Sequence, residues 1–172
     1  NYGDQITACV NAAHARGLQV HVWKVNWNLS GAPQSFIDGP RAANRTQVSS
    51  SGAAIDWLCP SQPDNFALET NSMLEVVRNY DVDGIHFDYI RYPDVLPFTP
   101  GSRFDVGLDF GFGEASRERF LKDTGLEAPF RRETRNAEAF DDWRRAQVTA
   151  VVREIAAASR SSRPGLELSA AG

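Results

Sequence analysis

The segment DVDGIHFDYIRYP, residues 81–93, holds the side chains best suited to chemistry in this chain. Successive side chains of an extended strand alternate, so Gly84, His86 and Asp88 share one face while large apolar side chains occupy the other. A carboxylate is costly to bury unless it is paired or used in function. We therefore predict that Asp88 is a catalytic or ligand-binding carboxylate, with a structural ion pair to Arg91 as the alternative.

Two neighbours of Asp88 have predictions of their own. His86 lies one step deeper on the same face, where a hydrogen-bonded core histidine and a ligand contact fit equally well. Asp83 precedes the strand, and we expect it to form the turn from which the strand starts. Because strand ends gather ligands in parallel sheets, the position of Asp88 near the carboxyl end of its strand favours a role in function.

Hydrophobic periodicity predicts an alternating series of helices and strands. Helices are expected at residues 4–16, 63–80, 114–123 and 138–159, and strands at residues 18–27, 84–89 and 166–171. Such alternation indicates an α/β fold in which helices cover parallel strands. Because three strands cannot close a barrel of eight, we predict a partial (β/α)8 TIM barrel. Residues 1–172 are expected to form this single domain, truncated at both ends.

The lengths of the connections point to one functional face. The two long ones, expected as a loop over residues 28–62 and an irregular stretch over residues 90–137, both follow strands. The connections from helix to strand are short. In a parallel α/β fold, the segments that follow strands build the active face. The sequence therefore predicts that the long connections surround a binding site.

Composition narrows the possible classes of protein. The chain is 42% hydrophobic and 23% charged, which favours a folded globular unit over disorder. Its net charge is -4 without a basic stripe, so nucleic acid is not an expected partner. No apolar run approaches the roughly 18 residues of a membrane span. Cys9 and Cys59 match no zinc ligand set and are expected to be buried as small apolar residues. We expect neither a metal ion nor a cofactor.

Several motifs, in this order along the chain, resemble one known family. The segment at residues 81–93 resembles strand four of the glycosyl-hydrolase-like family 10, once called domain of unknown function 187. HVWKVNWN at residues 21–28 is similar to strand three of that family. Three shorter motifs agree: Trp57-Leu58-Cys59-Pro60, where cysteine replaces the usual asparagine, Asp142-Trp143-Arg144-Arg145, and Ser169-Ala170-Ala171.

This resemblance implies an enzyme that hydrolyses O-glycosidic bonds in a polysaccharide or cell-wall glycan on a barrel fold. Carbohydrate is then the expected ligand, and the expected location is extracellular or in the periplasm and cell envelope. Glycosidases flank the scissile bond with two carboxyl groups, about 5 Å apart in retaining and about 6.5–9.5 Å apart in inverting enzymes. Asp88 is the candidate for one of them, as nucleophile or as base.

Two sources of the second carboxyl group are open. Glu138, Asp141 and Asp142 lie at the start of a predicted helix, from which they can reach the mouth of a barrel. Acids at this position also stabilise the N-terminus of a helix, which is the alternative role. The other source is a strand outside residues 1–172.

Further side chains are expected to bind the substrate. Aromatic rings can stack on the apolar C–H faces of sugars, so Trp23 and Trp27 are either substrate contacts or core residues. Arg91 can donate hydrogen bonds to a sugar, or lower the pKa of Asp88 and keep it ionised. The predicted substrate-binding residues are Trp23, Asn26, Trp27, His86, Tyr89, Arg91, Asp142, Trp143 and Arg144.

Two other functions fit the same residues. The first is a non-catalytic carbohydrate-binding barrel, in which Asp88 only accepts a hydrogen bond from a sugar hydroxyl. The second is a metal-dependent hydrolase that uses His86 and Asp88 as ligands. Two ligands are too few for a firm site, so this alternative needs further ligands from segments outside the chain.

Overall fold

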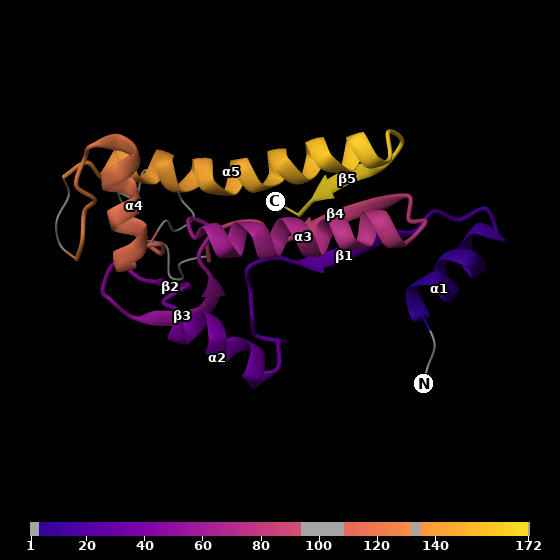
Figure 1. Ribbon diagram of the computed structural model, residues 1–172, viewed down its shortest axis with the longest axis horizontal. Helices are drawn as coiled ribbons and strands as arrows, with labels where there is room; N and C mark the ends of the chain where they lie inside the picture. Colours follow the sequence, from indigo (N-terminus) through magenta and orange to yellow (C-terminus); the bar gives the residue numbers. More distant parts are fainter. Residues whose placement is uncertain (1–3, 94–108, 132–134, 172) are drawn as a thin grey trace. The chain divides into compact units, whose positions relative to one another are not determined.

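The computed structural model describes residues 4–93, 109–131 and 135–171 (Figure 1). The chain divides into two compact units. The first, called the sheet unit, comprises Asn1–Asn26, Ala67–Ile90 and Val151–Gly172. The second, called the loop unit, comprises Trp27–Phe66 and Arg91–Ala150.

The sheet unit contains three parallel strands, drawn side by side in Figure 1. They are β1 (His21–Val25), β4 (Gly84–Asp88) and β5 (Glu167–Ala170), in the spatial order β1-β4-β5. Both neighbouring pairs are parallel. Each strand lies within a segment for which the sequence predicted a strand.

The helices that precede these strands also match the predictions. They are α1 (Gln5–His14), α3 (Pro63–Asn79) and α5 (Ala137–Ser162). The side chain of Asp4 caps α1 by accepting a hydrogen bond from the Thr7 N–H at 3.1 Å. Pro63 occupies the first position of α3, where its missing N–H has no consequence.

Burial on β4 follows the predicted alternation. Ile85 and Phe87 are buried, whereas His86 and Asp88 keep part of their surface exposed. Apolar side chains cover the buried face of the sheet unit from the helices. Those with almost no exposed surface are Met73, Leu74, Val77, Val151 and Ile155.

The loop unit corrects the prediction that residues 28–62 form an irregular loop. This segment contains α2 (Gln34–Ala42) and an antiparallel pair of strands, β2 (Thr46–Val48) and β3 (Ala54–Leu58). Gly39 and Pro40 inside α2 disfavour a helix, and β2 has only three residues, so local residue preference does not predict either element. Burial of Ile37 and Pro40 anchors the helix instead.

The short helix expected near residues 114–123 is present as α4 (Glu114–Thr124). Gly125 ends it in the left-handed conformation, with φ of 73°, and its N–H donates to the Leu121 carbonyl at 2.8 Å. Glycine is suited to this helix stop because positive φ has a low cost for a residue without a side chain.

Aromatic rings form the core of the loop unit. Phe112, Phe120, Phe140 and Trp143 make one buried cluster, in which neighbouring ring centroids lie 5.0–5.9 Å apart. Phe120 and Phe140 have no exposed surface. The cluster joins α4 to the first turns of α5, so it positions both helices of this unit.

Gly111→Ala is expected to destabilise the protein by about 2–4 kcal/mol. Gly111 has φ of 88°, and a Cβ atom there would lie 2.8 Å from the Tyr92 ring and 3.0 Å from Arg144 Cδ. Both neighbours are buried. Urea unfolding of the complete protein measures this change in free energy.

Gly39→Ala is the matched control for this substitution. Gly39 lies inside α2, and a Cβ atom there would meet nothing within 4 Å. Alanine favours the helix, so this variant should gain up to about 1 kcal/mol. Equal free energies of unfolding for the two variants would contradict the close packing around Gly111.

The two cysteines differ in their surroundings. Cys59 is buried, as predicted, whereas Cys9 is exposed on α1. The prediction for Cys9 was wrong because α1 buries only a narrow stripe, in which Val10 is the buried residue. None of the described helices is both long and apolar enough to span a membrane.

Candidate active site

Asp88 ends the central strand of the sheet unit, paired with Val25 of β1, and further hydrogen bonds hold it. Its carbonyl oxygen accepts the Asn26 N–H at 2.7 Å. Its carboxylate Oδ1 accepts the N–H of Tyr89 at 3.0 Å. Tyr89 has φ of 52°, a conformation that is uncommon for a non-glycine residue and frequent at functional sites. The carboxylate therefore has a defined orientation while part of its surface stays accessible.

Asp88 shares its face of the sheet with two rows of paired side chains. Strand register puts Trp23, His86 and Ser169 in one row, one step closer to the amino ends than Asp88. His86 Nδ1 and Ser169 Oγ share a hydrogen bond of 2.8 Å, and the Trp23 ring meets the His86 ring edge-on at 5.7 Å. Trp23 is 68% exposed, so its ring is accessible to a ligand within this unit.

The next row explains why glycine starts β4. His21, Gly84 and Glu167 share a register, and His21 Nε2 lies 3.6 Å from Glu167 Oε2. A Cβ atom on Gly84 would lie 2.4 Å from the His21 ring. From its amino to its carboxyl end, this face therefore carries the row of His21 and Glu167, the row of His86 and Ser169, and finally Asp88.

The opposite face of the sheet contains a buried polar network that the sequence did not reveal. Glu69 of α3 is 4% exposed and accepts hydrogen bonds from Lys24 Nζ and, at 2.8 Å, from Asn26 Nδ2. Asn26 has no exposed surface, so its amide bonds to Glu69 rather than facing solvent. Its predicted contact with substrate stays a prediction.

A signal for this network was present in the sequence. Glu69 lies three residues after Phe66 and four before Met73, on the apolar stripe of α3. Lys24 lies two residues after Val22, on the side of β1 that faces the helices. An acid on a buried helix stripe needs a partner, and a lysine at a buried strand position is a suitable one.

The amino end of β4 has a separate ionic cluster. Asp83 Oδ2 accepts the Val20 N–H at 2.7 Å and lies 2.9 Å from His14 Nε2. This confirms that Asp83 is a structural residue at the start of the strand. The hydrogen bond with His14, followed by that from Val20, holds the pKa of Asp83 below its ordinary value of 3.8.

Asp83 is expected to make stability depend on acid pH. A carboxyl group whose pKa is lower in the folded than in the unfolded state stabilises the fold fully above 3.8. This stabilisation is lost as pH falls through the folded-state pKa. Urea unfolding from about pH 6 down to about pH 2 should show the wild type losing its advantage over Asp83→Asn. An advantage that stays constant with pH would refute this role.

Five predicted contacts lie in the loop unit, and two of them are aromatic core residues. Trp143 belongs to the aromatic cluster, stacks on Phe140 at 5.9 Å and donates from Nε1 to Asp123 at 3.0 Å. Trp27 is 1% exposed and has φ of 58°. These positions are typical of core aromatic residues, and sugar stacking by either ring stays a prediction.

The predicted contact Arg144 is 1% exposed in the same unit. Its guanidinium pairs with Asp141, donates to the Phe110 carbonyl and lies 4.5 Å from the centres of the Phe112 and Phe140 rings. Burial lowers the pKa of Arg144 from its ordinary value. Arg144 thus joins the start of α5 to the segment before α4.

The start of α5 has exposed and buried charges. Asp142 is exposed and accepts from Arg145 at 2.8 Å, whereas Asp141 pairs with the buried Arg144.

Arg91, also in the loop unit, donates to the Tyr92 carbonyl at 3.5 Å. Within the described part of the sheet unit, Asp88 has no ion pair. The roles predicted for Asp142 and Arg91 in binding stay predictions.

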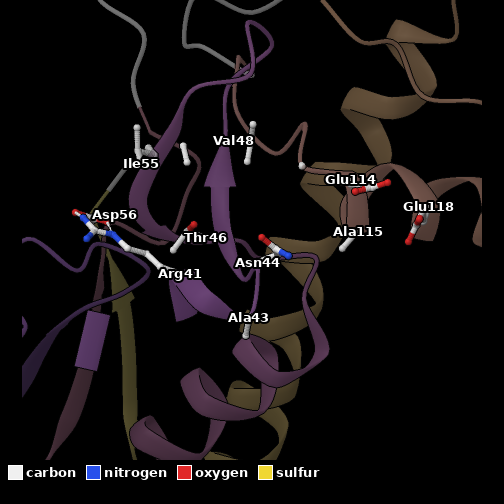
Figure 2. Close-up of a pocket in the computed structure, with 12 residues that line it drawn as sticks. Arg41, Ala43, Asn44, Thr46, Val48, Ile55, Asp56, Glu114, Ala115 and Glu118 are labelled. Carbon is white, nitrogen blue, oxygen red and sulfur yellow. Dashed lines mark hydrogen bonds and ion pairs between the residues drawn. The ribbon is translucent and has the colours of Figure 1, made fainter. Parts of the chain in front are cut away.

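The loop unit also contains an open pocket of about 910 Å³ (Figure 2). Figure 2 shows Glu114 and Glu118 of α4 on one side and Arg41 with Asp56 on the other. Arg41 and Asp56 form two hydrogen bonds, of 2.7 and 2.6 Å. The described lining residues are polar, charged or aliphatic, and none of them is aromatic.

Metal ligands do not gather in the described part of the chain. It contains no group of three or more histidine, cysteine, aspartate or glutamate side chains arranged to hold a metal ion. His86, one of the two ligands considered for a metal site, bonds instead to the Ser169 hydroxyl.

Comparisons with known proteins identify relatives of this chain. The chain is 23% identical over 165 residues to glycosyl hydrolase YngK of Bacillus subtilis (strain 168), and this match covers 94% of this chain and 28% of that protein. It is 26% identical over 180 residues to glycosyl hydrolase DigH of Escherichia coli (strain K12), and this match covers 95% of this chain and 34% of that protein. The chain therefore spans about a third or less of the length of these relatives.

A solved structure supports the fold. Alpha-L-fucosidase isoenzyme 2 from Paenibacillus thiaminolyticus superposes with a TM-score of 0.64 and 18% identity, over 96% of this chain and 22% of that chain. This likeness and the parallel sheet confirm the predicted α/β fold class, a partial (β/α) barrel. The family model described as glycosyl hydrolase-like 10 matches residues 1–171. The chain thus belongs to the glycosyl hydrolase-like 10 family.

Proposed function

We propose that this glycosyl hydrolase-like chain is part of an enzyme that cleaves O-glycosidic bonds, with Asp88 as a catalytic carboxylate. The substrate is a polysaccharide or a cell-wall glycan. The observation that carries the proposal is the accessible, oriented carboxylate of Asp88 at the carboxyl end of the central strand. In this fold, catalytic groups come from the carboxyl ends of strands.

The surroundings of Asp88 suit a nucleophile or a base. The Tyr89 N–H donates to Oδ1 and so fixes the orientation of the carboxylate. A charged carboxylate can attack the anomeric carbon or take a proton from water. The exposed Trp23 ring, one row below, provides an apolar surface for a sugar ring. A second carboxyl group is required to protonate the leaving oxygen.

A screen of the complete protein tests this function. The wild type should release reducing ends from at least one glycan in a panel of polysaccharides and purified peptidoglycan. The anomeric configuration of the first product, followed by NMR, distinguishes retention from inversion and so sets the distance to the second carboxyl group. Activity that survives a chelator excludes the metal-dependent alternative. Binding without turnover would favour the carbohydrate-binding barrel.

The family also suggests a location. We propose that the enzyme acts outside the cytoplasm, in the periplasm or the cell envelope, where cell-wall glycan is accessible. Fractionation of the source organism with an antibody to this chain tests the location. Recovery in the cytoplasmic fraction alone would contradict it.

A further inference from the structure

Behind Asp88, the buried carboxylate of Glu69 holds one end of a chain of hydrogen bonds. Glu69 accepts from Asn26 Nδ2 at 2.8 Å, and the N–H of the same asparagine donates to the Asp88 carbonyl at 2.7 Å. Lys24 of β1 also donates to Glu69. Only one residue therefore lies between the Glu69 carboxylate and the backbone of Asp88.

The network is buried enough for each of its bonds to matter. Glu69 is 4% exposed and Asn26 has no exposed surface. The Oδ1 atom of Asn26 has no hydrogen-bond partner among the described residues, so its Nδ2 group is the side-chain atom through which this asparagine is held. A buried amide that loses its acceptor pays a desolvation penalty, so removal of Glu69 should displace Asn26.

Displacement of Asn26 would reach Asp88 directly. β1 ends at Val25, and Asn26 is the next residue, so its N–H continues the ladder between β1 and β4 by one bond. That bond and the Tyr89 N–H bond both orient Asp88, beyond its pairing with Val25 in the ladder. Loss of one allows the end of β4 to move while the buried strand below it stays in place.

We propose that Glu69 is a positioning residue for Asp88, acting through Asn26. The inference rests on the proposed function for its kinetic consequence, but not for its structural one. Lys24 neutralises the Glu69 charge, which makes burial of this acid tolerable. Glu69 is buried on the opposite face of the sheet from Asp88, so it is not a candidate for the second carboxyl group.

Glu69→Ala in the complete protein tests the proposal, with Glu75→Ala as the matched control. Glu75 belongs to the same helix, α3, but is exposed. In Glu69→Ala, hydrogen exchange of the Asn26 backbone N–H should be faster by tenfold or more, relative to the backbone N–H groups in the middle of β4. Glu75→Ala should leave the exchange unchanged. Equal protection of the Asn26 amide in both variants would overturn the proposal, whatever reaction the enzyme catalyses.

The kinetic readout uses the glycan that the wild type hydrolyses fastest. A misplaced catalytic group can reduce turnover by about 10²-fold, so Glu69→Ala should lower kcat by about that factor with little change in KM. Glu69→Gln keeps an acceptor for Asn26 and should restore most of the activity. If kcat depends on Asp88 but not on Glu69, this inference fails while the proposed function stands. If substitution of Asp88 leaves the activity unchanged, the proposed function fails.

A second variant covers the case in which Glu69→Ala does not fold. Asn26→Ala removes the side-chain bond to Glu69 and leaves the pair between Lys24 and Glu69 intact. The proposal expects lower kcat and faster exchange at residue 26, with KM unchanged. A rise in KM alone would instead identify Asn26 as a substrate contact and overturn its role in positioning.

Discussion

Asp88→Asn is expected to lower kcat for glycan hydrolysis by about 10³-fold or more in the complete protein. Asparagine has nearly the same shape and can still accept the Tyr89 N–H, so the strand end should keep its structure. It cannot act as a nucleophile or as a base, which removes the chemical step. Initial rates on the best glycan from the panel, with kcat and KM determined separately, measure the effect.

Asp38→Asn is the matched control for this variant. Asp38 is exposed on α2, where it accepts from the Gln34 amide at 2.7 Å. The same chemical change there should leave kcat within about twofold of the wild type. Asp88→Asn retaining more than a tenth of the wild-type kcat would remove Asp88 from the chemical step. If the wild type binds a glycan but does not hydrolyse it, the carbohydrate-binding barrel is the better assignment.

Arg144→Ala is expected to cause the largest loss of stability, about 3–5 kcal/mol. The guanidinium is 1% exposed and lies 4.5 Å from the centres of the Phe112 and Phe140 rings, while it also bonds to Asp141 and the Phe110 carbonyl. Truncation leaves a cavity and deprives a carboxylate and a carbonyl of their donor. The free energy of unfolding in urea, taken at one pH and salt concentration, provides the measurement.

Arg145→Ala provides the comparison for the buried arginine. Arg145 pairs with the exposed Asp142, and such pairs contribute about 0–1 kcal/mol. A similar, small loss in both variants would show that Arg144 does not hold the core. If Arg144→Ala instead raised KM and left stability unchanged, the sequence-based prediction of a substrate contact would be supported.

The sequence was sufficient for the regular elements that build the sheet. Alternation of Ile85 and Phe87 with His86 and Asp88 predicted both the strand and the face on which the carboxylate lies, because side chains on a strand follow a period of two. The apolar stripe of α3 and the glycine after α4 were equally direct, since they reflect local backbone preferences and one-sided burial. Family motifs then identified the kind of protein.

The tertiary structure alone decided which polar residues are partners. Glu69 and Asn26 are 43 residues apart in the sequence, and their bond exists only because α3 packs behind β1. Arg144 follows an acidic helix start that suggests an exposed position, yet the aromatic cluster encloses it. The spacing of apolar residues in the sequence indicates which side of a helix or strand is buried. The partner of a buried charge depends instead on contacts between distant segments. For this reason the sequence determined where Asp88 lies, and only the fold decided what holds it there.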